Sequence, residues 1–109
     1  MELIETKLEL LQGRLLDMAH LVKTQVQNSK KALLEKNNEL ADEVIAEDEE
    51  VDGFELKISQ NCEQILALYN PVAIDLRFIL ASIKISLSLE RMGDLAEGVC
   101  HLIKGIKKE

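Results

Sequence analysis

The chain interrupts its helical pattern at only two places, and this scarcity of breaks is what most restricts its fold. It holds one Pro and five Gly among 109 residues, too few for an all-β domain with its many turns. The breaks are the polar run Lys36-Asn37-Asn38 and the dipeptide Asn70-Pro71. Because Asn caps helix starts and Pro suits the first helical position, each break predicts the start of a new helix. The chain therefore divides into three long helical segments.

Each segment carries apolar residues at alternating steps of three and four, the spacing that places them on one helix face. Segments of about 32 to 37 residues would be about 50 Å long at 1.5 Å per residue. Because short connections make neighbouring helices antiparallel, we expect an all-α, up-down-up three-helix bundle that occupies residues 1–109 as one domain. The expected core positions are Ile4, Leu8, Leu11, Leu15, Met18 and Val22 on the first helix, Leu40, Val44, Val51, Phe54, Ile58, Cys62, Ile65 and Tyr69 on the second, and Phe78, Ala81, Ile85, Met92, Leu95 and Val99 on the third.

The third helix carries a second apolar stripe, which consists of Leu76, Leu80, Ile83 and Leu87. At 100° per residue this stripe lies roughly opposite the first. One bundle core does not easily cover two sides of a helix. Either the other helices wrap the third helix or a partner covers the second stripe, since apolar stripes of this size are seldom left in water. A two-fold homodimer would provide such a partner, because one patch on two copies is able to be self-complementary.

Charge and composition exclude several functions. The chain has 13 Lys and Arg against 20 Asp and Glu, a net charge of −7, which argues against nucleic acid or an anionic membrane surface as the main partner. The N-terminus lacks the features of a signal peptide, and no stretch reaches the roughly 18 apolar residues of a membrane span. We therefore expect a cytoplasmic protein without membrane insertion. Cys62 and Cys100 lack CxxC spacing and are expected to be reduced, buried thiols.

Acidic residues continue the second stripe toward the end of the third helix. Glu90 and Asp94 form an i, i+4 pair with Cβ atoms about 5–6 Å apart. The second helix holds a similar pair, Asp48 and Asp52, with Glu55 on the same side. Like charges at this spacing repel, so a cation between them would relieve the repulsion. If the two helices lie antiparallel, the pairs converge into an oxygen-ligand site suited to Mg, Ca, Mn or Fe.

Two simpler interpretations compete with a metal site. The run Glu47–Asp52 reads EDEEVD, and an acidic run on a helix is usually a solvated face. Lys84 and Arg91 would also neutralise the acids through salt bridges. We find no Ser-His-Asp arrangement, Gly-rich phosphate loop or redox motif in the sequence, so we do not expect an enzyme.

Two stretches of the third segment resemble the hallmark of the PhoU phosphate-signalling regulators. Residues 70–77 read NPVAIDLR, and residues 89–94 read LERMGD. The family pattern is close to PVAxDLR, followed by a spacer that contains a Lys and then by LERxGDxA. In this chain Lys84 fits the spacer and Ala96 fits the final Ala. The segment Asp48–Asp52 resembles the acidic motif of the family on the preceding helix. The resemblance covers essentially the whole chain.

This resemblance implies a fold, a site and a set of partners. PhoU proteins are built from three-helix bundles like spectrin repeats, and they bind metal clusters through E(D)xxxD motifs. These motifs map onto Asp48 and Asp52, and onto Glu90 and Asp94. The expected metal is Fe, Zn, Mn, Mg or Ca, and the resemblance does not decide between them. The resemblance also implies a cytoplasmic negative regulator, without catalysis of its own, that couples the phosphate ABC transporter to a sensor histidine kinase.

Partner contacts are expected near the start of the third helix. The resemblance makes Asp75 and Arg77 candidates for these contacts, and Leu76 and Leu80 belong to the second stripe. PhoU proteins usually carry two tandem bundles, whereas this chain predicts one. We therefore expect it either to pair with a second copy or to be one half of a longer natural chain. The alternative function is a metal-free helical bundle that serves only in oligomerisation or docking.

Overall fold

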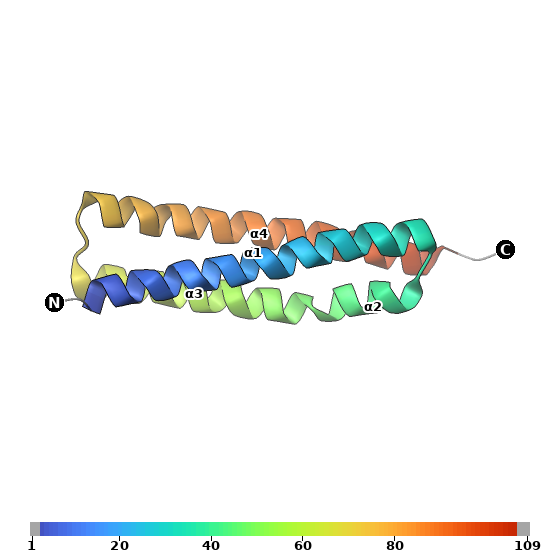
Figure 1. The fold of residues 1–109 in the computed structure, drawn as a ribbon, viewed down its shortest axis with the longest axis horizontal. Helices are drawn as coiled ribbons and strands as arrows, with labels where there is room; N and C mark the ends of the chain where they lie inside the picture. Colours follow the sequence, from blue (N-terminus) through green and yellow to red (C-terminus); the bar gives the residue numbers. More distant parts are fainter. Residues whose placement is uncertain (1–2, 107–109) are drawn as a thin grey trace.

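The computed structural model describes residues 3–106 as a set of long helices (Figure 1). Helix α1 spans Leu3–Glu35, α2 spans Asn38–Ala46, α3 spans Asp48–Tyr69 and α4 spans Ala73–Gly105. α1 runs the length of the molecule, α2 and α3 return together, and α4 runs forward again. The molecule measures 64 × 17 × 17 Å. The predicted all-α class is confirmed, and the helices lie lengthwise in an up-down-up order.

The first predicted break separates α1 from α2. Lys36 adopts a φ of 53°, in the left-handed region, and this turns the chain out of α1. Asn37 is the N-cap of α2, and its side-chain oxygen accepts a 3.0 Å hydrogen bond from the Leu40 N–H. This bond satisfies one of the backbone donors that a helix start leaves without partners. The predicted role of this break is confirmed.

The second predicted break separates α3 from α4, but its residues act differently from the prediction. Asn70 ends α3 in the left-handed conformation, with a φ of 45°. Val72 is the N-cap of α4, without a side-chain capping bond, and Ala73 begins the helix. The expectation that Asn70 caps α4 and that Pro71 opens it is therefore wrong. Asn tolerates left-handed backbone better than most residues, so Asn70 suits the end of a helix as well as its start.

The second predicted helix is interrupted at Glu47, so one expected helix is in fact α2 and α3. Glu47 keeps near-helical angles, with φ −68° and ψ −14°, and caps both helices. Near the break, the Val44 carbonyl accepts a hydrogen bond from the Gln25 side chain on α1. The apolar spacing did not reveal this interruption. A single residue with near-helical angles hardly changes which side of the helix the following side chains occupy.

The core follows the predicted seams of α1 and of α2 and α3. Every predicted position on these helices is buried or partly buried. α1 packs against both α3 and α4, and the end of α4 packs against α2. The fully or nearly fully buried members are Leu11, Leu15, Met18, Val22, Val44, Val51, Ile58, Cys62 and Ile65. Both cysteines are free and buried, as expected.

α4 buries a different face from the predicted one. Small residues dominate this face, which lies between the two apolar stripes, and they let neighbouring helices approach closely. The buried hydroxyl of Ser82 donates a 2.7 Å hydrogen bond to the Phe78 carbonyl, so it is satisfied within the helix. The buried residues of α4 are Ile79, Ser82, Ser86, Gly93, Ala96, Cys100 and Ile103. Among the predicted positions, Ala81, Ile85, Met92 and Leu95 are exposed, and Phe78 and Val99 are partly buried.

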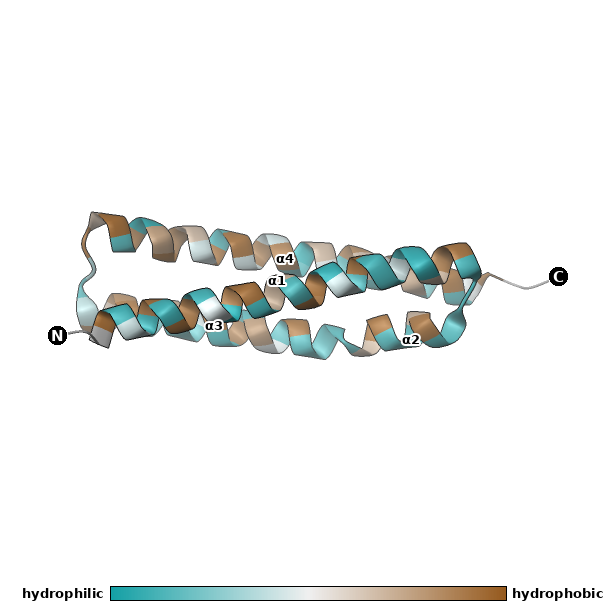
Figure 2. Cartoon of the chain, viewed as in Figure 1, coloured by the Kyte–Doolittle hydropathy of each residue, from teal (hydrophilic) through white to brown (hydrophobic). Residues whose placement is uncertain are grey.

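Both apolar stripes of α4 are thus only partly covered. In the second stripe, Leu80 is 48% and Leu87 is 42% exposed, while Leu76 and Ile83 are partly buried. Hydrophobic residues are visible on the side of α4 that is turned away from the other helices (Figure 2). None of the described helices is long and apolar enough to cross a membrane.

Candidate metal centre

The acidic pairs of α3 and α4 meet along the groove between these helices. Because α3 and α4 are antiparallel, the start of α3 lies beside the later turns of α4 (Figure 1). The carboxylates gather in two groups, in each of which ligand oxygens lie within 4.8 Å of one another. We name them the Asp48 cluster, which consists of Asp48, Asp94 and Glu97, and the Asp52 cluster, which consists of Asp52, Glu55 and Glu90.

The structure brings the four predicted residues together, divided between the two clusters. Asp48 pairs with Asp94 across the groove, and Asp52 pairs with Glu90. Two further members, Glu55 and Glu97, were not among the predicted ligands. A sequence signal exists for both, because each follows a predicted ligand by three residues and so shares its helix face.

The Asp48 cluster is partly withdrawn from water. Asp48 and Glu97 are partly buried and Asp94 is exposed. The Asp48 Oδ1 atom is buried and has no hydrogen-bond partner among the described residues. Burial raises the pKa of Asp48 to about 6, with further contributions from Glu97, Asp52 and Asp94. A carboxylate in this setting is stabilised by a proton or by a cation.

The EDEEVD run is only in part a solvated face. Glu49 and Glu50 are exposed, whereas Glu47 and Asp48 are partly buried. Like Asp48, Glu47 has a buried side-chain oxygen without a partner in the described chain. Burial raises the pKa of Glu47, and the charges of Glu50 and Glu43 raise it further. Two acids at the helix break are therefore partly withdrawn from water.

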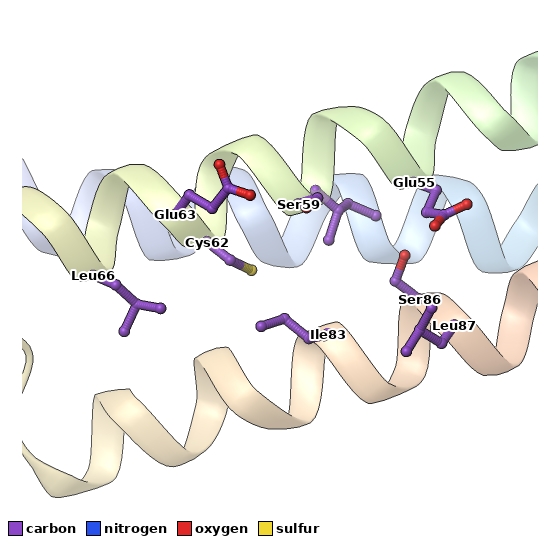
Figure 3. Close-up of a pocket in the computed structure, with 9 residues that line it drawn as sticks. Glu55, Ser59, Cys62, Glu63, Leu66, Ile83, Ser86 and Leu87 are labelled. Atoms are coloured by element: carbon purple, nitrogen blue, oxygen red, sulfur yellow. The ribbon is translucent and has the colours of Figure 1, made fainter.

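The Asp52 cluster borders a pocket between α3 and α4. Asp52 is exposed, and Glu55 and Glu90 are partly buried. Glu55 also lines the pocket, which has a volume of about 140 Å³ (Figure 3). The Cys62 thiol points into this space (Figure 3). The other lining residues are Ile58, Ser59, Glu63, Leu66, Ile83, Ser86 and Leu87.

The Cys62 thiol lines this pocket. Burial raises its pKa, and the charge of Glu63 raises it further. A thiol is a nucleophile and a strong metal ligand only as thiolate. Oxygen atoms are therefore the donors that this groove offers, and such donors suit hard cations such as Mg, Ca and Mn.

Salt bridges do not neutralise the two clusters. Lys84 and Arg91 are exposed, and neither forms an ion pair within the described chain. The ion pair present there joins Lys104 Nζ to Asp42 Oδ1 at 2.5 Å and links the last turn of α4 to the middle of α2. The alternative in which Lys84 and Arg91 satisfy the acids is therefore wrong for this structure.

The predicted partner-binding residues lie away from the clusters. Asp75 and Leu76 are partly buried in the first turns of α4, and Arg77 and Leu80 are exposed. Fifteen residues separate Asp75 from Glu90, about 22 Å along a helix at 1.5 Å per residue.

Comparison with protein families and known sequences gives consistent matches. The family model described as the PhoU domain matches residues 15–103. A phosphate-specific transport system accessory protein PhoU homolog of Aquifex aeolicus is 43% identical over 100 residues, which are 92% of this chain and 43% of that protein. The corresponding PhoU protein of Serratia marcescens is 37% identical over 95 residues, which are 87% of this chain and 39% of that protein.

Solved structures match the fold equally well. The phosphate transport system regulatory protein PhoU from Streptococcus pneumoniae has a TM-score of 0.89 at 28% identity, over 96% of this chain and 50% of that one. PhoU from Pseudomonas aeruginosa also has a TM-score of 0.89, at 35% identity, over 91% of this chain and 47% of that one. The chain spans half or less of the length of each of these relatives.

Proposed function

The chain belongs to the PhoU family, and we propose that it acts as a regulator of phosphate uptake. The observation that carries this proposal is the 43% identity, over 92% of the chain, to a relative named as an accessory protein of phosphate-specific transport. In the proposed role the protein is a cytoplasmic negative regulator that couples the phosphate ABC transporter to a sensor histidine kinase. It has no catalytic activity of its own.

A pull-down from cells grown in phosphate-rich medium tests this role. We expect the tagged chain to recover subunits of the phosphate transporter and the sensor kinase. The comparison is a variant with Asp75→Ala and Arg77→Ala. It removes the two candidate partner contacts and leaves the distant carboxylate clusters intact. Recovery of neither partner by the wild-type chain would contradict the regulatory role.

The second part of the proposal is that the two carboxylate clusters bind metal ions. Its main support is the buried Asp48 Oδ1 atom, which has no hydrogen-bond partner in the described chain and lies among acids. Three carboxylates in each cluster provide the oxygen donors that hard cations require. The Asp48 cluster would hold one cation through Asp48, Asp94 and Glu97, and the Asp52 cluster another through Asp52, Glu55 and Glu90.

The residues themselves explain what such binding would do. A bound cation supplies positive charge that offsets the repulsion between carboxylates of neighbouring helices. The ligands of each cluster come from both α3 and α4, so occupancy would fasten these two helices together. In the absence of a cation, repulsion between Asp48 and Asp94 across the groove opposes their packing. Metal occupancy is therefore proposed to stiffen the part of the bundle beside the helix break.

A third part concerns the apolar flanks of α4. Leu80, Leu87 and Leu95 are 48%, 42% and 72% exposed, and a second bundle would remove them from water. We propose that a second copy or a tandem PhoU domain packs there, with Leu76 and Leu80 in the contact. At about 25 cal/mol per Å² of buried apolar surface, such burial favours association, and salt screens the repulsion between the two acidic chains.

Light scattering across a dilution series tests this association. We expect at least a dimer at micromolar concentration, and we expect Leu80→Lys to reduce the mass. Leu34→Lys is a matched control, because Leu34 is 72% exposed at the end of α1. A wild-type monomer at high micromolar concentration, with Leu80→Lys changing neither mass nor stability, would contradict the proposed contact.

The same exposed flanks support the alternative function, a metal-free bundle used only for oligomerisation or docking. In that case partner binding depends on apolar residues such as Leu80 and is indifferent to chelators. The metal-binding regulator instead requires intact carboxylate clusters. Partner recovery in the presence and absence of a chelator separates the two functions.

A further inference from the structure

A fully buried glutamine, Gln25, lies in α1 opposite the Asp48 cluster. Its side chain is 0% exposed, although long polar side chains are seldom fully buried. Gln25 continues the apolar seam of α1 three residues after Val22, at a position where an apolar residue is expected. Burial of a polar side chain is unfavourable unless the side chain is hydrogen-bonded. A polar residue at a core position therefore points to a role other than core packing.

The first contact of Gln25 is with the backbone of α2. Its Nε2 atom donates a 3.2 Å hydrogen bond to the Val44 carbonyl. Val44 belongs to the last turn of α2, where backbone carbonyls lose their partners within the helix. Asp48 follows Val44 by four residues, one helical turn away across the break at Glu47. Gln25 thus holds the backbone turn that leads into Asp48.

The second feature is the space at Gly93 of α4, which the Gln25 amide faces. A Cβ atom placed on Gly93 would lie 3.0 Å from Gln25 Oε1, closer than side chains normally approach. It would also lie 3.7 Å from a methyl group of Val51. Gly93 therefore leaves the space that the Gln25 amide fills, and it directly precedes Asp94. The Gln25 amide thus bonds the backbone of α2 and fills the space left by Gly93 of α4, beside two members of the Asp48 cluster.

These contacts come at a cost to stability. Gln25 Oε1 is buried and accepts no hydrogen bond from the described residues, and a buried acceptor without a partner is unfavourable. An aliphatic or Met side chain would fill this core position without that cost. The amide is therefore explained better by its effect on the neighbouring backbones than by its contribution to the core.

We propose that Gln25 is a positioning residue for the Asp48 cluster. Its amide fixes the end of α2 and the backbone at Gly93 in the relative position that lets Asp48 and Asp94 share one cation. This inference rests on the proposed metal binding, and Gln25 itself is not a ligand. Groups that orient metal ligands typically change metal affinity by about 10- to 100-fold when they are removed.

Isothermal titration with Mn²⁺ of the metal-free chain tests this role. Gln25→Met keeps the length of the side chain and removes the hydrogen bond, and we expect it to weaken Mn²⁺ binding by about 10-fold or more. Helix content by circular dichroism should remain unchanged. Ser29→Ala is the matched control, because Ser29 is also buried on α1 but bonds only the Val26 carbonyl of its own helix. We expect this control to bind Mn²⁺ with wild-type affinity.

A double-mutant cycle gives a second, independent readout. Gly93→Ala in the wild-type background should displace the Gln25 amide and weaken Mn²⁺ binding. In a Gln25→Ala background the added methyl group has room, so Gly93→Ala should have little further effect. Gly93→Ala by itself leaves Gln25 in the chain, so its effect on Mn²⁺ binding still tests the inference if the Gln25 variants do not fold.

The outcomes separate this inference from the proposed metal binding. If the wild-type chain binds no Mn²⁺ or other divalent cation, the metal proposal fails and the role of Gln25 fails with it. If the wild-type chain binds Mn²⁺ and Gln25→Met binds it equally well, the metal proposal stands and the positioning role is overturned. Weaker binding by Gln25→Met together with wild-type binding by Ser29→Ala supports the role.

Discussion

The two carboxylate clusters are built from the same residue types on the same two helices, yet their surroundings differ. Each cluster has two partly buried carboxylates and one exposed carboxylate, which is Asp94 in the first and Asp52 in the second. They differ in Asp48 Oδ1, which is buried and has no hydrogen-bond partner within the described chain. Water already stabilises an exposed carboxylate, so a buried one gains more from a cation. Burial, and not the number of acids, should therefore decide which cluster binds metal more tightly.

The largest expected effect comes from removing one ligand from each cluster. We predict that Glu90→Gln combined with Asp94→Asn strongly lowers bound metal and leaves the fold intact. Because the change removes repulsion between like charges at i, i+4, the melting temperature in chelator should be equal to or higher than that of wild type. The stabilisation that added metal gives to the wild-type protein should be lost. Full metal content in the double variant would show that α4 does not supply the ligands.

Single substitutions sharpen the comparison between the clusters. We predict that Asp48→Asn weakens Mn²⁺ affinity more than Asp52→Asn does, because Asp48 is the more buried carboxylate. Both changes remove one charge and keep the side-chain size, so they form a matched pair. Titration calorimetry on the two metal-free variants measures the difference. A larger loss from Asp52→Asn would reverse our ranking of the clusters.

The pH dependence should have opposite signs without and with metal. In the metal-free protein the pKa of Asp48 is raised from 3.8 to about 6, so the folded state binds more protons than the unfolded state in this range. The free energy of unfolding should therefore decrease as the pH rises from 3.8 toward about 6. Glu47, whose pKa is also raised, contributes in the same direction. Metal affinity should instead weaken as the pH falls through about 6, because protons compete for the carboxylates.

Chemical denaturation in chelator at about pH 5 and about pH 7 measures the first effect. Asp48→Asn is the control, since it removes the group that titrates and should flatten the profile. A metal-free wild-type protein that becomes more stable across this range would contradict the environment assigned to Asp48.

The smallest effect is expected for an acid outside both clusters. Asp75 lies in the first turn of α4, where a carboxylate interacts favourably with the helix dipole by roughly 0.3–1 kcal/mol. We predict that Asp75→Lys lowers the free energy of unfolding by about this amount and leaves Mn²⁺ affinity unchanged. Thermal denaturation and calorimetry provide the two readouts. Unchanged stability with loss of partner recovery would assign Asp75 to partner contact instead.

The core positions of α1, α2 and α3 were predicted from the sequence, because large apolar residues occupy them. The core face of α4 was missed because Ser82, Ser86 and Gly93 give little hydrophobic signal, while larger residues beside them dominate the pattern. The break at Glu47 was missed for a different reason. The buried residue that contacts the backbone there, Gln25, is distant in the sequence, so no local signal reveals the contact.

Four of the six carboxylates of the candidate site were predicted from the sequence, but their grouping was not. Spacing of four residues identified Asp48 with Asp52 and Glu90 with Asp94 as pairs on one helix. The structure instead groups Asp48 with Asp94, because the relative position of two packed helices decides which carboxylates meet. That position depends on packing contacts such as the one between Gln25 and Gly93, which a helical pattern alone does not contain.

The central claim is that the α3–α4 groove is a metal site, and the metal content of the purified chain tests it most directly. The protein should be prepared without chelator and without a metal-affinity tag, and then analysed by mass spectrometry for all metals. We predict stoichiometric binding of a hard cation, with a marked loss in Asp48→Asn. A chain that is free of metal, and that also remains free after incubation with Mn²⁺, Mg²⁺, Ca²⁺, Zn²⁺ and iron, would contradict the claim.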